Sequence, residues 1–164
     1  LVKGIEFLAT LGPIGKKCPA PGTFGSFAGV LAVLLLSWST QLPLLTIGLL
    51  FIPLILIGIP ICTKAEKSIG RADPGEVIWD EFTSIPLVYI GLPASISLVN
   101  PSEMLIWMVV GFIYFRIFDI TKPLGIKRIQ HIGKGLGVMI DDVLAALYAA
   151  GLLHLTFTFS LSFF

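Results

Sequence analysis

Charged residues are scarce in this 164-residue chain, where Asp, Glu, Lys and Arg together make up 13%, against roughly 25% in a soluble domain. The formal net charge is +1, so no basic surplus favours nucleic acid as a partner. Histidine occurs only at positions 131 and 154, which gives little support to a phosphohistidine mechanism. The two cysteines, Cys18 and Cys62, lack the C-x5-R spacing of cysteine phosphatases.

Apolar residues dominate instead, at 55% of the chain, with a mean hydropathy of +0.96. About 20 consecutive apolar residues cross a bilayer as a helix. The sequence therefore predicts an all-α fold, a polytopic membrane bundle of about five transmembrane helices with cytoplasmic loops, as a single domain over residues 1–164. The predicted spans are 24–40, 42–63, 78–98, 102–120 and 138–160, the first being short enough to be tilted or re-entrant.

The basic residues indicate the orientation of these helices. Nearly all of them precede the first span, separate the second from the third, or separate the fourth from the fifth. They are Lys3, Lys16, Lys17, Lys64, Lys67, Arg71, Lys122, Lys127, Arg128 and Lys134, with Arg116 in the last turns of the fourth span. With five spans these regions share one side, which the positive-inside rule assigns to the cytoplasm.

Two adjacent acidic pairs, Asp80-Glu81 and Asp141-Asp142, stand where the third and fifth spans begin. An ionised side chain at the centre of a span costs about 2.5–3.5 kcal/mol, and less near the interface. Two carboxylates about 5 Å apart repel by roughly 3 kcal/mol at an effective dielectric of 20. A divalent cation removes both costs, and oxygen ligands suit Mg²⁺. The alternative is that these acids are stabilised by the positive ends of the helix dipoles at the helix N-termini.

Arg116, Asp119 and Lys122 lie in the last turns of the fourth span and step by three residues, which spreads them over about 120° of helix surface. One interpretation is an interfacial ion pair beside a Lys that extends toward water. The other makes Asp119 a further ligand or proton acceptor, with Arg116 and Lys122 binding phosphate oxygens.

Two glycine-containing loops lead into helix starts, at residues 21–26 and 133–137. Free N–H groups at a helix start bind phosphate, which makes these two loops candidate phosphate sites, although each signal is weak alone. Neither loop is a Walker motif or a Rossmann fingerprint. Thr23 as a helix cap and glycines that permit close helix packing are the structural alternatives.

Four stretches of the sequence together resemble the phosphatidylglycerophosphatase A family, and they occur in the family's order. They are Pro21-Gly22-Thr23-x-Gly25-Ser26, Trp79-Asp80-Glu81-Phe82, Phe115-Arg116-x-Phe118-Asp119-x-x-Lys122-Pro123 and Gly135-x-Gly137-x-Met139-x-Asp141-Asp142. The resemblance implies a Mg²⁺-dependent hydrolase of the bacterial inner membrane that converts phosphatidylglycerophosphate to phosphatidylglycerol at the cytoplasmic face.

Residue by residue, the resemblance and the charges give one expected site. The carboxylates Asp80, Glu81, Asp141 and Asp142 are expected to bind Mg²⁺, with Asp80 and Asp141 as the direct ligands, and to act in catalysis together with Asp119. The phosphate is expected to contact Thr23, Ser26, Arg116, Lys122 and Lys134. The main alternative is a cation channel or transporter that uses the acidic pairs as an ion path, although these acids cluster at one face. Motifs of the CDP-alcohol phosphatidyltransferases and of the histidine-dependent lipid phosphatases are not found in the sequence.

Overall fold

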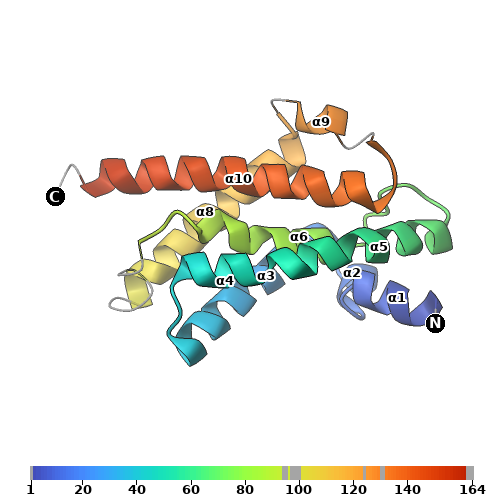
Figure 1. Cartoon of the computed structure of the whole chain (residues 1–164), viewed down its shortest axis with the longest axis horizontal. Coiled ribbons are helices and arrows are strands. Elements are labelled where there is room, and N and C mark those ends of the chain that lie inside the picture. Colours follow the sequence, from blue (N-terminus) through green and yellow to red (C-terminus); the bar gives the residue numbers. More distant parts are fainter. Residues whose placement is uncertain (1, 94–95, 97–100, 124, 130–131, 162–164) are drawn as a thin grey trace.

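The computed structural model describes residues 2–93, 96, 101–123, 125–129 and 132–161. Every regular element within these residues is a helix (Figure 1). The predicted fold class, an all-α membrane bundle, is confirmed.

Two short helices, α1 (Val2–Ala9) and α2 (Ile14–Lys17), form the N-terminal end of the chain. Helix α1 packs along α5 (Ile52–Ile69). The Ile78 N–H donates to the Ala9 carbonyl at 2.9 Å, and the Glu6 carboxylate accepts a hydrogen bond from Ser68 on α5. The N-terminal helices are therefore attached both to α5 and to the loop that follows it.

Among the residues that the structure describes, four helical stretches are long and apolar enough to cross a membrane. They are α3 (Pro21–Thr40), the nearly continuous pair α4 (Leu44–Leu50) and α5, α8 (Pro101–Thr121) and α10 (Lys134–Leu161). Large apolar side chains on their outer faces are exposed, as a lipid-facing surface requires, and Leu35 and Ile106 are 63% and 61% exposed. Helix α3 begins with Pro21 and ends at Gln41, whose left-handed backbone terminates the helix.

The third predicted span, over 78–98, is not a continuous helix. Its described part forms a short helix α6 (Trp79–Ser84) and a 3₁₀ helix η1 (Ile85–Tyr89). Pro86 lacks an N–H and cannot continue the α-helical hydrogen bonding. All five residues of η1 are buried, so the run is apolar because protein, rather than lipid, surrounds it. Within the described residues, this corrects the expected five spanning helices to four long helices, with the buried, broken α6–η1 segment in place of the fifth.

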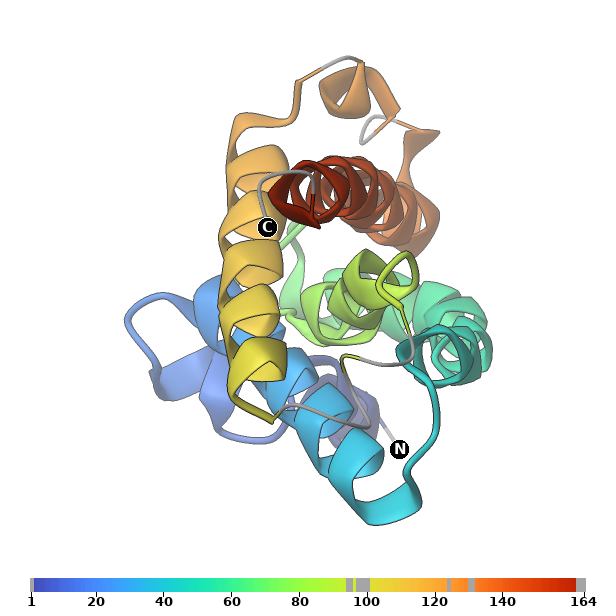
Figure 2. The ribbon, with the colours of Figure 1, turned by 90° about the vertical axis from the view of Figure 1, so that its left-hand side faces the viewer.

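The interior of the bundle is built around η1. Viewed from the left-hand end of Figure 1, the yellow-green α6–η1 segment lies among α3, α4–α5, α8 and α10 (Figure 2). The Tyr89 hydroxyl donates to the Met108 carbonyl on α8 at 2.9 Å. Helix α10 presents buried Ala145, Ala146 and Ala149, and such small side chains allow helices to approach closely.

Glycines bring the start of α3 against α6. A Cβ added at Gly25 would lie 2.9 Å from Ile78 Cβ, and one added at Gly29 would lie 2.6 Å from the Phe82 carbonyl oxygen. No side chain fits at those separations. The close approach places the first turns of α3 beside the acidic first turn of α6.

Candidate active site

Three carboxylates from two helices converge beneath the first turns of α3. Asp80 and Glu81 lie in the first turn of α6, and Asp142 lies on α10. One oxygen from each lies within 4.8 Å of the others. Asp80 and Asp142 are buried, at 5% and 3% exposure, and Glu81 is half-buried. The contact between α6 and α10 thus brings Asp142 to the Asp80-Glu81 pair.

The electrostatic balance of this trio is incomplete. Within the described part of the chain, Asp80 Oδ1, Glu81 Oε2 and Asp142 Oδ2 are buried and accept no hydrogen bond. Unpaired buried carboxylates are costly, and mutual repulsion adds to that cost. A hard divalent cation satisfies oxygen-only donors of this kind. The donor set therefore fits Mg²⁺.

Gly22 on α3 allows Glu81 to reach this position. A Cβ added at Gly22 would clash with Glu81 Oε1 and would lie 3.4 Å from Arg116 Nη1. The glycine at this point of the motif leaves the space that the Glu81 carboxylate occupies.

Arg116 connects α8 to α3 at the edge of the carboxylate trio. Its Nη1 donates to Asp119 Oδ2 at 2.5 Å and to Ser26 Oγ at 3.3 Å. Ser26 Oγ in turn donates to the Gly22 carbonyl at 2.9 Å. Arg116 Nε is buried and has no partner among the described residues. The guanidinium is therefore held in place through Nη1, and its buried Nε donor is unused.

Asp119 is a fourth carboxylate close to the trio. It pairs with Arg116 and also lies close enough to Glu81 and Asp142 to repel their charges. The Arg116–Asp119 ion pair, one of the two interpretations of this segment, is therefore present, and it lies against the trio.

Lys122 directly follows α8 and has a left-handed backbone, φ 43°, which residues other than glycine rarely adopt. Its amine donates a hydrogen bond to Asp141 Oδ2. Burial of the amine lowers the Lys122 pKa, but the hydrogen bond to Asp141 and the charges of Asp141 and its acidic neighbours together raise that pKa above its ordinary value. Lys122 is therefore a stable cation beside the site.

Asp141 and Asp142 have different surroundings although both were expected to bind metal. Neighbours on a helix point about 100° apart, and here Asp142 joins Asp80 and Glu81 while Asp141 binds Lys122. Asp142, rather than the expected Asp141, therefore lies with Asp80 and Glu81.

Asp73 is a residue that sequence reasoning missed. It lies in the loop between α5 and α6, where its N–H donates to Glu66 Oε1 at 2.9 Å. Its charge reaches Asp80, Asp141 and Lys122. In the sequence it reads as the first residue of an Asp-Pro-Gly turn, and only the folded chain places it beside the cluster.

The structure shows less about Thr23 and Lys134, the two remaining predicted phosphate ligands. Thr23 is half-buried in the first turn of α3, next to Gly22. Lys134 begins α10, but its side chain lies outside the described residues, as does His131. The Gly135 N–H donates to Thr63 Oγ1 at 3.1 Å, and a Cβ there would lie 2.5 Å from the Ile59 carbonyl. The close-packing interpretation of this glycine is confirmed.

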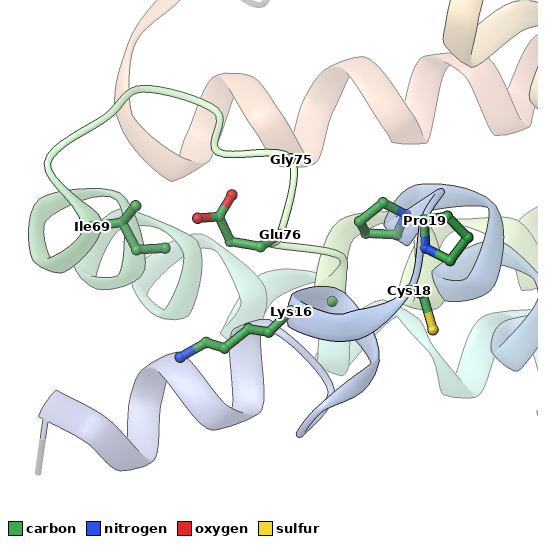
Figure 3. Close-up of a pocket in the computed structure, with 8 residues that line it drawn as sticks. Lys16, Cys18, Pro19, Ile69, Gly75 and Glu76 are labelled. Atoms are coloured by element: carbon green, nitrogen blue, oxygen red, sulfur yellow. The ribbon is translucent and has the colours of Figure 1, made fainter.

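A cavity of about 600 Å³ lies next to the start of α3, between the α2–α3 connection and the α5–α6 loop (Figure 3). Lys16, Cys18 and Glu76 are among the residues that line it, and Pro21, the neighbour of Gly22, is another. Glu76 binds Arg71 Nη2 through both oxygens, at 2.6 and 2.8 Å. None of the three converging carboxylates lines this cavity.

Comparisons with known proteins agree with the motif analysis. A family profile described as "Phosphatidylglycerophosphatase A" matches residues 7–157. The chain is 40% identical over 152 residues to a phosphatidylglycerophosphatase A of Haemophilus influenzae, covering 91% of this chain and 86% of that protein. It is 33% identical over 151 residues to the Escherichia coli protein of the same name, covering 92% and 78%.

A further relative, from Bacteroides thetaiotaomicron, carries the provisional name of a phosphatidylinositol-3-phosphatase and is 32% identical over 133 residues, covering 79% of each chain. No solved structure matches the chain. The comparisons give no support to a cation channel. With four membrane-length apolar helices, a match over nearly its whole length and these relatives, the chain belongs to the phosphatidylglycerophosphatase A family of membrane phosphatases.

Proposed function

We propose that this protein removes the terminal phosphate of phosphatidylglycerophosphate in a Mg²⁺-dependent hydrolysis, at the cytoplasmic face of the bacterial inner membrane. Its family makes it a lipid phosphatase of phosphatidylglycerol synthesis. The observation that carries the finer proposal is the convergence of Asp80, Glu81 and Asp142, with unpartnered oxygens, beside two held cations.

The cations suit a phosphomonoester. Arg116 offers a planar guanidinium with an unused Nε donor, and planar donors match phosphate oxygens well. Asp119 and Ser26 fix its orientation, which reduces the entropy lost on binding. Lys122, held by Asp141, supplies a second positive charge. We assign Asp119 and Asp141 to orienting these cations.

Asp80, Glu81 and Asp142 would hold the metal. When bound, Mg²⁺ neutralises phosphate charge and lowers the pKa of a coordinated water. Thr23 and Ser26 lie in the first turns of α3, beside Gly22, and the Ser26 hydroxyl contacts Arg116.

The location of the basic residues in the bundle supports a site on the cytoplasmic side of the membrane. The start of α10, the end of α5 and the N-terminal helices gather at the right-hand end of Figure 1, opposite the C-terminus. These elements carry most of the Lys and Arg residues, whose location favours the cytoplasm.

The test is phosphate release by purified protein in detergent, with phosphatidylglycerophosphate and Mg²⁺, before and after chelation by EDTA. Phosphatidylinositol-3-phosphate is the comparison substrate. We expect Mg²⁺-dependent release from phosphatidylglycerophosphate, its loss in Asp142→Asn, and near-normal release in Glu76→Gln, a loop acid that lies outside the trio. No release across a range of detergents and metals would contradict the proposal, and faster release from the inositol lipid would reassign the substrate.

A further inference from the structure

An apolar groove of about 430 Å³ runs between α3 and α8 on the membrane-facing side of the bundle. These helices lie side by side (Figure 2). Every residue that lines the groove is apolar, and four come from each helix. Buried Val30, Leu34 and Met108 are among its lining residues, and Leu31 and Val109, 41% and 58% exposed, leave it open toward lipid.

Two contacts between the helices mark the ends of this groove. At one end Ser37 Oγ contacts Met104 Sδ at 4.0 Å. At the other, Arg116 Nη1 donates to Ser26 Oγ at 3.3 Å. The lining residue Phe27 follows Ser26 directly in α3. The inner end of the groove therefore lies next to the Arg116–Ser26 contact that borders the carboxylate trio.

We infer that this groove holds an acyl chain of the lipid substrate while its phosphate lies at Arg116. The inference rests on the proposed function and specifies how the substrate is seated. A phosphomonoester at the inner end places the glycerol and its acyl chains toward the bilayer interior, which is the direction in which the groove runs. The open rim at Val109 admits the chain laterally from the membrane.

We expect the groove to position the substrate's phosphate rather than to add much binding free energy. Lipid tails are as apolar as the lining, so moving a chain from bulk lipid into the groove gains little free energy. Seating one chain nevertheless fixes the distance between the phosphate and the carboxylates. Because a misplacement of about 1 Å can reduce a rate by about 100-fold, loss of the seat lowers kcat/KM for the lipid.

The first experiment compares Val109→Trp, which fills the groove from its rim, with Ile106→Trp, which adds the same bulk on an exposed face of α8 outside the groove. Each is assayed with diacyl phosphatidylglycerophosphate and with its water-soluble deacylated headgroup. We expect Val109→Trp to lose roughly 10- to 100-fold in kcat/KM for the lipid while hydrolysis of the deacylated compound and all values for Ile106→Trp stay within about twofold. Equal behaviour of the two variants on the lipid would overturn the inference.

The second experiment does not depend on turnover. A non-hydrolysable phosphonate analogue of the lipid, with a photoreactive diazirine in one acyl chain, is irradiated with the protein in detergent. Labelling should fall on peptides containing Leu31 and Val109 and should be competed by unlabelled phosphonate. Equal labelling by phosphatidylcholine with the same diazirine chain would identify the groove as ordinary lipid contact and refute the inference. If the unchanged protein hydrolyses neither phosphate substrate, the proposed function fails, and the inference with it.

Discussion

Gly22 offers the sharpest separation of site geometry from fold stability. In Gly22→Ala the new methyl group clashes with Glu81 Oε1, so this carboxylate must retreat by about 1 Å to restore ordinary contact. The obstacle is the free end of a flexible side chain, which can rotate away at little cost. We therefore expect the free energy of unfolding to change by less than about 1 kcal/mol, while activity falls roughly 100-fold because the carboxylate is displaced.

Two other glycines provide matched controls for this variant. Gly29→Ala places its methyl group 2.6 Å from the Phe82 carbonyl oxygen and against Ile85, and neither buried backbone nor buried core can move easily. It should destabilise the protein by about 1–3 kcal/mol. Gly151 on α10 has open space around its Cβ position, so Gly151→Ala should be neutral or stabilise by up to about 1 kcal/mol.

The assay measures phosphate release and thermal unfolding of the three variants in one detergent. The expected pattern is loss of activity alone for Gly22→Ala, loss of stability for Gly29→Ala, and neither for Gly151→Ala. If Gly22→Ala retained near-normal turnover, Glu81 would not need the position that it occupies here, and the assignment of Glu81 to the trio would be refuted.

Three further predictions concern the cations, the metal and the membrane orientation. Lys122→Ala should raise KM for the lipid about tenfold or more, because a charge-assisted bond is lost, without unfolding the protein; an unchanged KM in steady-state assays would make this residue incidental. Asp142→Asn should abolish the rise in melting temperature that Mg²⁺ gives the unchanged protein, because stabilisation by a ligand disappears with its site; a preserved Mg²⁺ shift in thermal melts would argue against it. A Cys introduced at Ser102 should react with an impermeant reagent from outside the cell, and one at Gly70 should not; the reverse pattern would invert the topology.

The sequence predicts much of this fold because lipid-facing helices have a simple requirement for length and apolarity. Four of the expected spans are present as long helices. The stretch after Asp80 misled the prediction because a segment buried inside protein is as apolar as one that faces lipid. Pro86 was the available signal that its helix does not continue.

The sequence predicted which acidic residues lie near the site, but not which of them come into contact. Chain direction placed both acidic pairs near one level, and the structure brings three of the four carboxylates together. Which member of the second pair faces inward depends on the rotation of α10, which packing decides. Only the folded structure reveals that Asp73 is near the cluster, since nothing around it in the sequence distinguishes it from an ordinary turn residue.

The central claim is that Asp80, Glu81 and Asp142 bind one divalent cation, and anomalous diffraction from crystals soaked in Mn²⁺ tests it most directly. Mn²⁺ takes the same oxygen ligands as Mg²⁺ and can be located from its own scattering. The account predicts an anomalous peak among these three carboxylates, at roughly 2.0–2.3 Å from their oxygens, and none in crystals of Asp142→Asn. A peak elsewhere in crystals of the unchanged protein, or a fully occupied peak that survives Asp142→Asn, would contradict it.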